Sequence, residues 1–107
     1  MELRQIEYVV GVVDHGGFGR AADALFVTQP SLSQGVGSLE AELGIKLFHR
    51  LSRGVILTSA GEAFLKPARQ LLRDLQTLRA SVEAIQGLGA GRLDLVSLPS
   101  LAVYPLA

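Results

Sequence analysis

The sequence predicts a mainly α-helical chain in which three short helices and a β-hairpin precede one long helix. Apolar residues recur at helical spacing in three successive segments that are separated by glycine or by a short turn. The period then changes to two short β-prone runs around a turn. Finally, apolar residues repeat in a 4-3 pattern over about three heptads. A length of 107 residues is that of one ordinary domain.

The first helix is predicted from Met1 to Asp14. Its apolar face carries Leu3, Ile6, Val9, Val10 and Val13. Gly16 and Gly17 follow and end the helix. This face identifies the segment as a packing partner for the two helices that come next.

The second helix is predicted from about Phe18 to Leu25. Gly17 falls at its N-cap position, where glycine serves only slightly worse than serine. The paired alanines Ala21 and Ala22 allow a neighbouring helix to approach closely. A short turn, Phe26-Val27-Thr28, then leads directly into a third helix.

The third helix is bounded by strong local signals and has two contrasting faces. Thr28 is the expected N-cap, Pro30 lies in the first turn, and Gly44 follows the last periodic residue. The apolar stripe comprises Leu32, Val36, Leu39 and Leu43. The opposite side, which we call the polar face, comprises Pro30, Gln34, Gly37 and Ala41, flanked by Ser31, Ser33 and Ser38.

The polar face favours recognition of another surface. Gly35 and Gly37 each cost about 0.8–1 kcal/mol relative to alanine inside a helix, so a helix that met only solvent would more cheaply carry Lys, Glu or Ala. Small residues allow close approach, and Gln and Ser can hydrogen-bond base edges or phosphates. The alternative is a solvated surface with two tolerated glycines.

A β-hairpin is predicted from Lys46–His49 and Val55–Leu57, with a turn at Leu51–Gly54. A small hairpin after three helices is the arrangement called a winged helix. Arg50 and Arg53 lie on or near its tip, within a window from residue 43 to 61 that contains no acidic residue. These arginines are expected to contact phosphates or the minor groove of DNA, unless they are merely solvated turn residues.

The long helix is predicted to start at Thr58 or Ser59, where Ser59 and Glu62 fit a capping box. At 1.5 Å per residue it extends about 40 Å as far as Ile85. The preceding part of the chain is too small to cover such a stripe, so a second copy of the helix is the expected partner; packing within one chain is the alternative. The seam comprises Phe64, Ala68, Leu71, Leu75, Leu78, Val82 and Ile85.

The last segment is expected to be a flexible glycine-rich linker followed by a strand at Arg92–Leu98. A lone strand has no sheet to join, so it is interpreted as the opening of a second domain whose remainder is absent. The expected division is a winged-helix domain at 1–58, a dimerisation helix at 59–87, and the linker with this first strand at 88–107.

Composition narrows the classes of function. The formal net charge is zero, which argues against a generally basic nucleic-acid binder and favours the alternative of a winged-helix module that binds protein and not DNA. With two histidines, no cysteine and no nucleophile or metal-ligand motif, an enzyme is not expected. Charged residues interrupt the N-terminus and no apolar run approaches about 20 residues, so we expect a cytoplasmic protein.

Three stretches together resemble the DNA-binding region of LysR-type transcriptional regulators. They are FGRAADAL, VTQPSLSQGVGSLEAELGIKLFHR and VILTSAGEAFLKPAR, in that order and spacing, and the resemblance extends from Met1 to about Leu88. It implies a winged helix-turn-helix, a dimerising linker helix, and an effector-binding α/β domain beyond. The tail RLDLVSLPSLA resembles the first strand of that domain more weakly.

The resemblance also implies a function and a set of contact residues. The chain is expected to bind double-stranded DNA at a pseudo-palindromic operator as a homodimer, or as a tetramer in the full-length protein. No cofactor is expected here, because the effector would bind the missing domain. Gly17, Gly35 and Gly37 depart from the family pattern, which usually has a serine cap and longer polar side chains at these positions. The implied DNA contacts are Thr28, Gln29, Pro30, Ser31, Ser33, Gln34, Arg50 and Arg53.

Overall fold

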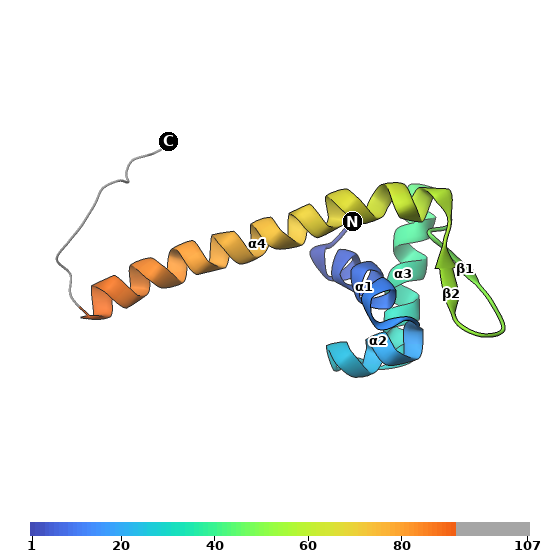
Figure 1. Cartoon of the computed structure of the whole chain (residues 1–107), viewed down its shortest axis with the longest axis horizontal. Coiled ribbons are helices and arrows are strands. Elements are labelled where there is room, and N and C mark those ends of the chain that lie inside the picture. The colour runs from blue at the N-terminus through green and yellow to red at the C-terminus, as the bar shows by residue number, and fades with distance from the viewer. Residues whose placement is uncertain (92–107) are drawn as a thin grey trace. The chain divides into compact units, whose positions relative to one another are not determined.

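The computed structural model describes the backbone of residues 1–91 and the side chains of residues 1–87 (Figure 1). The described residues confirm the predicted mainly helical fold with a two-stranded antiparallel sheet. Met1–Leu72 form one compact unit, which we call the head, and the described part of the second unit, residues 73–91, is helical. The elements are α1 (Leu3–His15), α2 (Phe18–Leu25), α3 (Gln29–Leu43), β1 (Phe48–Arg50), β2 (Val55–Leu57) and α4 (Ser59–Gly91).

The core of the head forms where α1, α2 and α3 meet (Figure 1). Ala21 and Ala22 of α2 are buried, as their small size predicted. The inward side chains of α1 and α3 interlock around them, and Leu47 and Phe48 close the core from the start of the hairpin. The fully buried members from α1 and α3 are Val9, Val12, Leu32, Val36 and Leu39.

The prediction that the apolar stripes of α1 and α3 are buried along their whole length is wrong at two residues. Leu3 and Leu43 are both 39% exposed. Leu3 is the first residue of α1 and Leu43 is the last of α3, so each lies at the end of its helix, where fewer neighbours cover it. On α1, Tyr8 and Val12 are buried in the core.

Glu40 takes an inward position on α3 and joins this helix to the hairpin. Its Oε2 accepts hydrogen bonds from the backbone N–H groups of Leu47, at 2.7 Å, and Phe48, at 3.3 Å. The Lys46 Nζ lies 3.9 Å from the Glu40 Oε1. A buried carboxylate is tolerated here because backbone donors satisfy it.

The caps of α2 and α3 follow the sequence signals. Gly17 is the N-cap of α2, and Thr28 is the N-cap of α3, where its Oγ1 accepts a hydrogen bond from the Ser31 N–H at 3.2 Å. Gly44 ends α3 with a φ of 73°, the left-handed conformation that favours glycine. By contrast, Phe26 ends α2 with a φ of 59°, which is uncommon for a bulky residue.

The wing comprises β1, β2 and the turn at residues 51–54. The strands pair Phe48 with Leu57 and Arg50 with Val55, and the Leu51 N–H donates to the Gly54 carbonyl at 2.9 Å. The first strand starts two residues later than the predicted Lys46.

Thr58 connects the wing to α4. Its hydroxyl donates to the Lys46 carbonyl at 2.7 Å and accepts from the Gly61 N–H at 3.0 Å. Thr58 is therefore the N-cap, and the capping box predicted from Ser59 to Glu62 is wrong because Ser59 is already helical. A Cβ at Gly61 would collide with the backbone carbonyl of Leu47, so the close approach of α4 to the wing requires glycine.

The first turns of α4 belong to the head, which extends past the expected boundary at residue 58 to Leu72. Phe64 and Ala68 pack against Ile6 and Val10 of α1. Asp14 accepts two hydrogen bonds from the Arg69 guanidinium, at 2.7 Å and 3.2 Å. These hydrogen bonds raise the pKa of Arg69 above its usual value.

The helix α4 ends at Gly91 and not at residue 87. Residues 88–91, which were expected to open a flexible linker, are thus helical, and this expectation is wrong. The predicted strand, with Leu93, Leu95, Val96 and Leu98, lies outside the described residues. No helix within residues 1–91 combines the length and apolarity that crossing a bilayer requires.

Candidate nucleic-acid interface

The start of α3 presents the predicted contact residues together on the surface. Those in its first two turns are exposed except Ser33, which is half-buried. Their exposure follows from the apolar stripe, which turns the opposite side of the helix outward. The exposed members are Gln29, Pro30, Ser31 and Gln34, with the cap residue Thr28 beside them.

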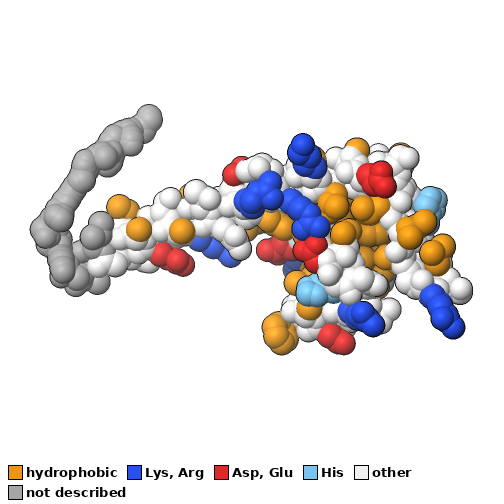
Figure 2. All heavy atoms as spheres, viewed as in Figure 1, with side chains coloured by type: hydrophobic (Ala, Val, Ile, Leu, Met, Phe, Trp, Pro, Cys, Tyr) orange, Lys and Arg blue, Asp and Glu red, His pale blue; other side chains and the backbone are white. Residues whose placement is uncertain are grey.

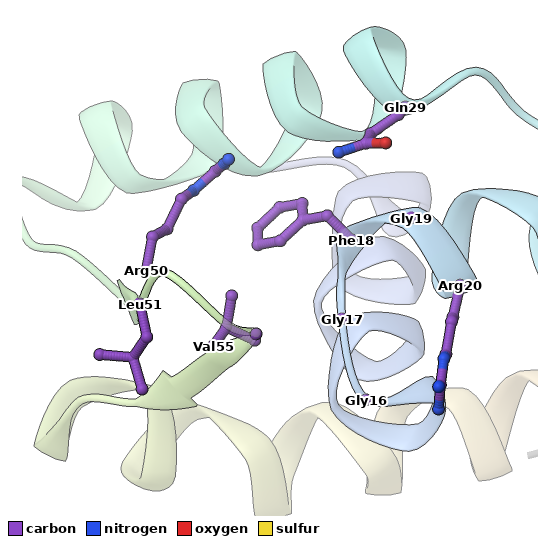
Figure 3. Close-up of a pocket in the computed structure, with 10 residues that line it drawn as sticks. Gly16, Gly17, Phe18, Gly19, Arg20, Gln29, Arg50, Leu51 and Val55 are labelled. Carbon is purple, nitrogen blue, oxygen red and sulfur yellow. The ribbon is translucent and has the colours of Figure 1, made fainter.

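A shallow pocket of about 350 Å³ lies between the starts of α2 and α3 and the wing (Figure 3). Gln29 contributes from α3 and Phe18 from α2, while Arg50 and Val55 contribute from the wing. Figure 3 shows the Arg50 side chain reaching from β1 toward α3. The pocket therefore brings Gln29 and Arg50, predicted separately from sequence, to one place.

Arg50 is held by an aromatic surface. Its Cζ lies 3.9 Å from the centroid of the Phe18 ring, a cation–π arrangement. The Phe18 ring in turn meets the Phe48 ring edge-on, with centroids 5.6 Å apart and planes at 72°. The guanidinium remains exposed, so it is oriented by the rings and still accessible to an anion.

Arg53 is placed differently from Arg50. It lies in the exposed turn of the wing between the two strands. Figure 2 shows basic side chains spread around the head and the hairpin, with no single continuous patch on the face in view. The two wing arginines therefore differ: Arg50, at the end of β1, stacks on Phe18, whereas Arg53 lies on the turn itself.

Arg20 was not singled out from the sequence. It is exposed in the first turn of α2 and lines the same pocket as Gln29, although Figure 3 shows its side chain directed away from Arg50. The available signal was its position beside Ala21 and Ala22, because a charged residue next to the inward alanines must point out of the core.

The two glycines of α3 have different surroundings. A Cβ at Gly35 would lie 2.7 Å from Cδ2 of Tyr8, so this position faces α1. A Cβ at Gly37 would meet nothing within 4 Å, which places Gly37 in open space on the polar face. A longer side chain at residue 35, as the family pattern suggests, would have to displace Tyr8.

The predicted dimerisation residues divide along α4. Ala68 is 3% exposed and packs with Phe64 inside the head. Farther along, the seam positions carry large exposed side chains, apart from the half-buried Leu75. The exposed members are Leu71 at 49%, Leu78 at 60%, Val82 at 53% and Ile85 at 67%.

Within residues 1–91, no group of three His, Cys, Asp or Glu side chains is arranged to hold a metal ion. Exposed polar and basic groups around one helix start can bind an extended anionic surface through hydrogen bonds and charge. The pocket between them is shallow and open to solvent, unlike the concave small-molecule sites that bury most of a ligand's surface.

Comparison with known proteins places this geometry in a family. Residues 3–62 match the family described as bacterial regulatory helix-turn-helix proteins of the lysR family. The HTH-type transcriptional regulator TfdT of Cupriavidus pinatubonensis is 47% identical over 97 residues, which are 90% of this chain and 42% of TfdT. The dual regulator OxyR of Escherichia coli is 37% identical over 106 residues, 99% of this chain and 35% of OxyR.

Solved structures of DNA-binding domains have the same fold as this chain. A CbnR DBD–DNA complex superposes with a TM-score of 0.73 at 38% identity, covering 80% of this chain and 99% of that one. A complex of the BenM DBD with catB site 1 DNA gives 0.76 at 41% identity, covering 80% and 97%. The chain spans well under half the length of the curated relatives TfdT and OxyR. It belongs to the lysR family of bacterial regulatory helix-turn-helix proteins.

Proposed function

We propose that this chain binds a specific double-stranded DNA sequence as a homodimer and is the DNA-reading part of a transcriptional regulator. The observation that carries the proposal is the exposed polar start of α3 beside the stacked guanidinium of Arg50. Two relatives of known structure, at 38% and 41% identity, were solved with DNA. The match to the family, over residues 3–62, covers the α3 and wing residues on which the proposal rests.

The first two turns of α3 are proposed to enter the major groove. An α-helix fits the width of this groove, and the Gln34 amide offers a donor and an acceptor that suit the edge of adenine. Pro30, Ser31 and Ser33 are small, so the helix can approach the bases closely. Thr28 contributes by fixing the start of the helix, since its hydroxyl accepts the Ser31 N–H.

The wing is proposed to bind the DNA backbone or the minor groove. Arg53 lies on the exposed turn, and Arg50 is oriented by Phe18, so less conformational freedom is lost when its guanidinium binds phosphate. The zero net charge does not oppose this, because ion pairs within the head occupy acidic residues, and residues 43–61, which include the wing, contain none. Arg69 pairs with Asp14, and Lys46 lies near Glu40.

The exposed seam of α4 is proposed to be the dimer contact. Exposed large apolar residues at 4-3 spacing are the pattern of two helices that pack together. A two-fold dimer reads a pseudo-palindrome with half-sites about one helical turn, or a multiple of it, apart. The proposed seam comprises Leu71, Leu75, Leu78, Val82 and Ile85.

We propose that the regulatory steps other than DNA binding and dimerisation depend on residues outside the described part of this chain. A small-molecule effector is proposed to act through the remainder of a longer protein, in which the subunits form tetramers. The regulator is proposed to act in the cytoplasm, where bacterial DNA is found, and we assign it no enzymatic step. An alternative, a winged-helix module that binds only protein, is favoured by the zero net charge alone.

Measuring the affinity of Gln34→Ala for DNA tests the proposal. The probes are a duplex selected from genomic fragments and a mixed-sequence duplex, and the matched control is Gln76→Ala on the exposed side of α4. Specific binding should weaken by about 1–3 kcal/mol, the range for a good base contact, while non-specific binding changes little. Equal losses on both duplexes would exclude Gln34 from base reading. Failure of the unaltered chain to bind any duplex in a salt-dependent way would favour the protein-binding alternative.

A further inference from the structure

A second groove, of about 500 Å³, follows the side of α3 away from the wing pocket. It lies between the start of α1 and the outer side of α3, and it shares no lining residue with the wing pocket. On α3 it is lined by Ser31, Gln34 and Ser38. At about 100° per residue, Ser38 lies half a turn around the helix from Gln29, so the two hollows border opposite edges of the polar face.

The start of α1 is tied to α3 at two points. The Gln5 Nε2 donates to the Gly35 carbonyl at 3.3 Å, while the Gln5 Oε1 accepts from the Glu2 N–H at 2.8 Å. The amino group of Met1 lies 2.8 Å from the Glu42 Oε1. Because both anchors lie on α3, the chain between Met1 and Gln5 is held alongside that helix.

Arg4 lies between these anchors and lines the groove. Its side chain is 68% exposed, and its ion pair with Glu2 is long, at 3.4 Å, and equally exposed. Such a pair contributes little to stability, so a stronger anion can replace the carboxylate at small cost. The hydroxyls of Ser31 and Ser38 in the same groove are groups that commonly bind phosphate oxygens.

We infer that Arg4 is a further phosphate contact, which binds the DNA backbone on the side of α3 opposite to the wing. This inference rests on the proposed function, since it needs α3 in the major groove. The polar face would then be held between two backbone contacts, Arg4 on one side and the wing arginines on the other. Phosphate contacts of this kind fix the register of the helix without reading sequence.

Glu2 should oppose this contact. Its carboxylate lies beside Arg4 and lines the groove, so it both competes for the guanidinium and repels a phosphate. Glu2→Gln keeps a side-chain oxygen at the start of α1 and removes the charge. The two substitutions, at Arg4 and at Glu2, are therefore expected to change DNA affinity in opposite directions.

The experiment is a salt titration of binding to a mixed-sequence duplex long enough for two half-sites. For Arg4→Ala, the slope of log affinity against log salt should flatten by about 1.8, because the bound dimer loses two phosphate contacts at about 0.9 each. Arg4→Lys should restore the slope, because lysine still supplies a cation. Glu2→Gln should raise the affinity several-fold. Arg79→Ala, on an exposed part of α4, is the matched control and should leave the slope unchanged.

An unchanged slope in Arg4→Ala, with the unaltered chain still binding in a salt-dependent way, would overturn this inference and leave the proposed function standing. A flattened slope that Arg4→Lys fails to restore would also overturn it, because the loss would then come from packing. Absence of binding by the unaltered chain would overturn both the Arg4 contact and the proposed function. Thermal unfolding of each variant without DNA checks that the exposed Arg4 side chain contributes little to the fold.

Discussion

Gly35 and Gly37 lie two residues apart in α3, and a methyl group added at each is expected to change stability in opposite directions. Replacing glycine by alanine inside a helix normally stabilises it by about 0.8–1 kcal/mol. At Gly37 nothing lies within 4 Å of the new Cβ, so this gain should be realised in full. At Gly35 the new Cβ would lie 2.7 Å from Cδ2 and 2.8 Å from Cε2 of Tyr8, closer than real carbon atoms approach.

The expected cost at Gly35 follows from the packing of Tyr8. Tyr8 is 8% exposed and belongs to the core cluster, so its ring cannot simply swing into solvent. Overpacking a core usually costs about 1–3 kcal/mol. Subtracting the gain in helix propensity leaves Gly35→Ala destabilised by roughly 1 kcal/mol, with a range of about 0–2. The two variants should therefore differ by roughly 2 kcal/mol.

Equilibrium unfolding in urea, followed by circular dichroism at one protein concentration, measures both values. A third measurement assigns the cause. In a double-mutant cycle, Tyr8→Leu should cost less in the Gly35→Ala background than in the unaltered chain, because the smaller side chain removes the clash. If Gly35→Ala is as stable as Gly37→Ala, the close contact between α1 and α3 at Tyr8 is not real, and the reasoning fails.

Four further outcomes are expected. Arg53→Ala should weaken binding to all duplexes and flatten the salt slope by about one unit for each protomer of the bound dimer; an unchanged slope would place Arg53 away from phosphate. Leu75→Asp buries a carboxylate in the seam from both chains, so sedimentation should show monomers and DNA affinity should collapse, whereas a dimeric variant would place the interface elsewhere. Glu40→Ala leaves two buried N–H groups without their acceptor and should lower the free energy of unfolding by about 2–4 kcal/mol, while Glu40→Gln, which keeps an oxygen, should lose less. Phe26→Asn should raise the free energy of unfolding by about 1 kcal/mol, because Phe26 is 94% exposed and asparagine tolerates positive φ; a loss of stability would show that the ring contributes to packing.

The parts of the fold that were predictable from sequence depend on interactions between near neighbours. Thr28 caps a backbone group three residues ahead of it, and Gly44 ends the helix through its own backbone conformation. The bounds of α2 and the strand Val55–Leu57 were likewise predicted correctly. In each case the residues that decide the structure lie within a few positions of one another.

The features that were missed depend on residues from separate elements. Whether Gly35 faces solvent or α1 is decided by Tyr8, and the orientation of Arg50 is decided by Phe18. Neither contact leaves a periodic signal. Glu40 did leave one, since it follows Val36 by four residues and so lies toward the core, but a search for apolar residues alone passes over a carboxylate.

The helix α4 contributes to two different interiors, one within its own chain and one proposed between chains. Substitutions along it should therefore fall into two phenotypic classes in a mutational scan for loss of regulation. Changes at Phe64 or Ala68 would remove the active protein by unfolding the head and would be recessive, since such chains cannot pair productively. Polar changes at Val82 or Ile85 would leave a folded, abundant monomer. Cellular protein level would separate the two classes without any measurement of DNA binding.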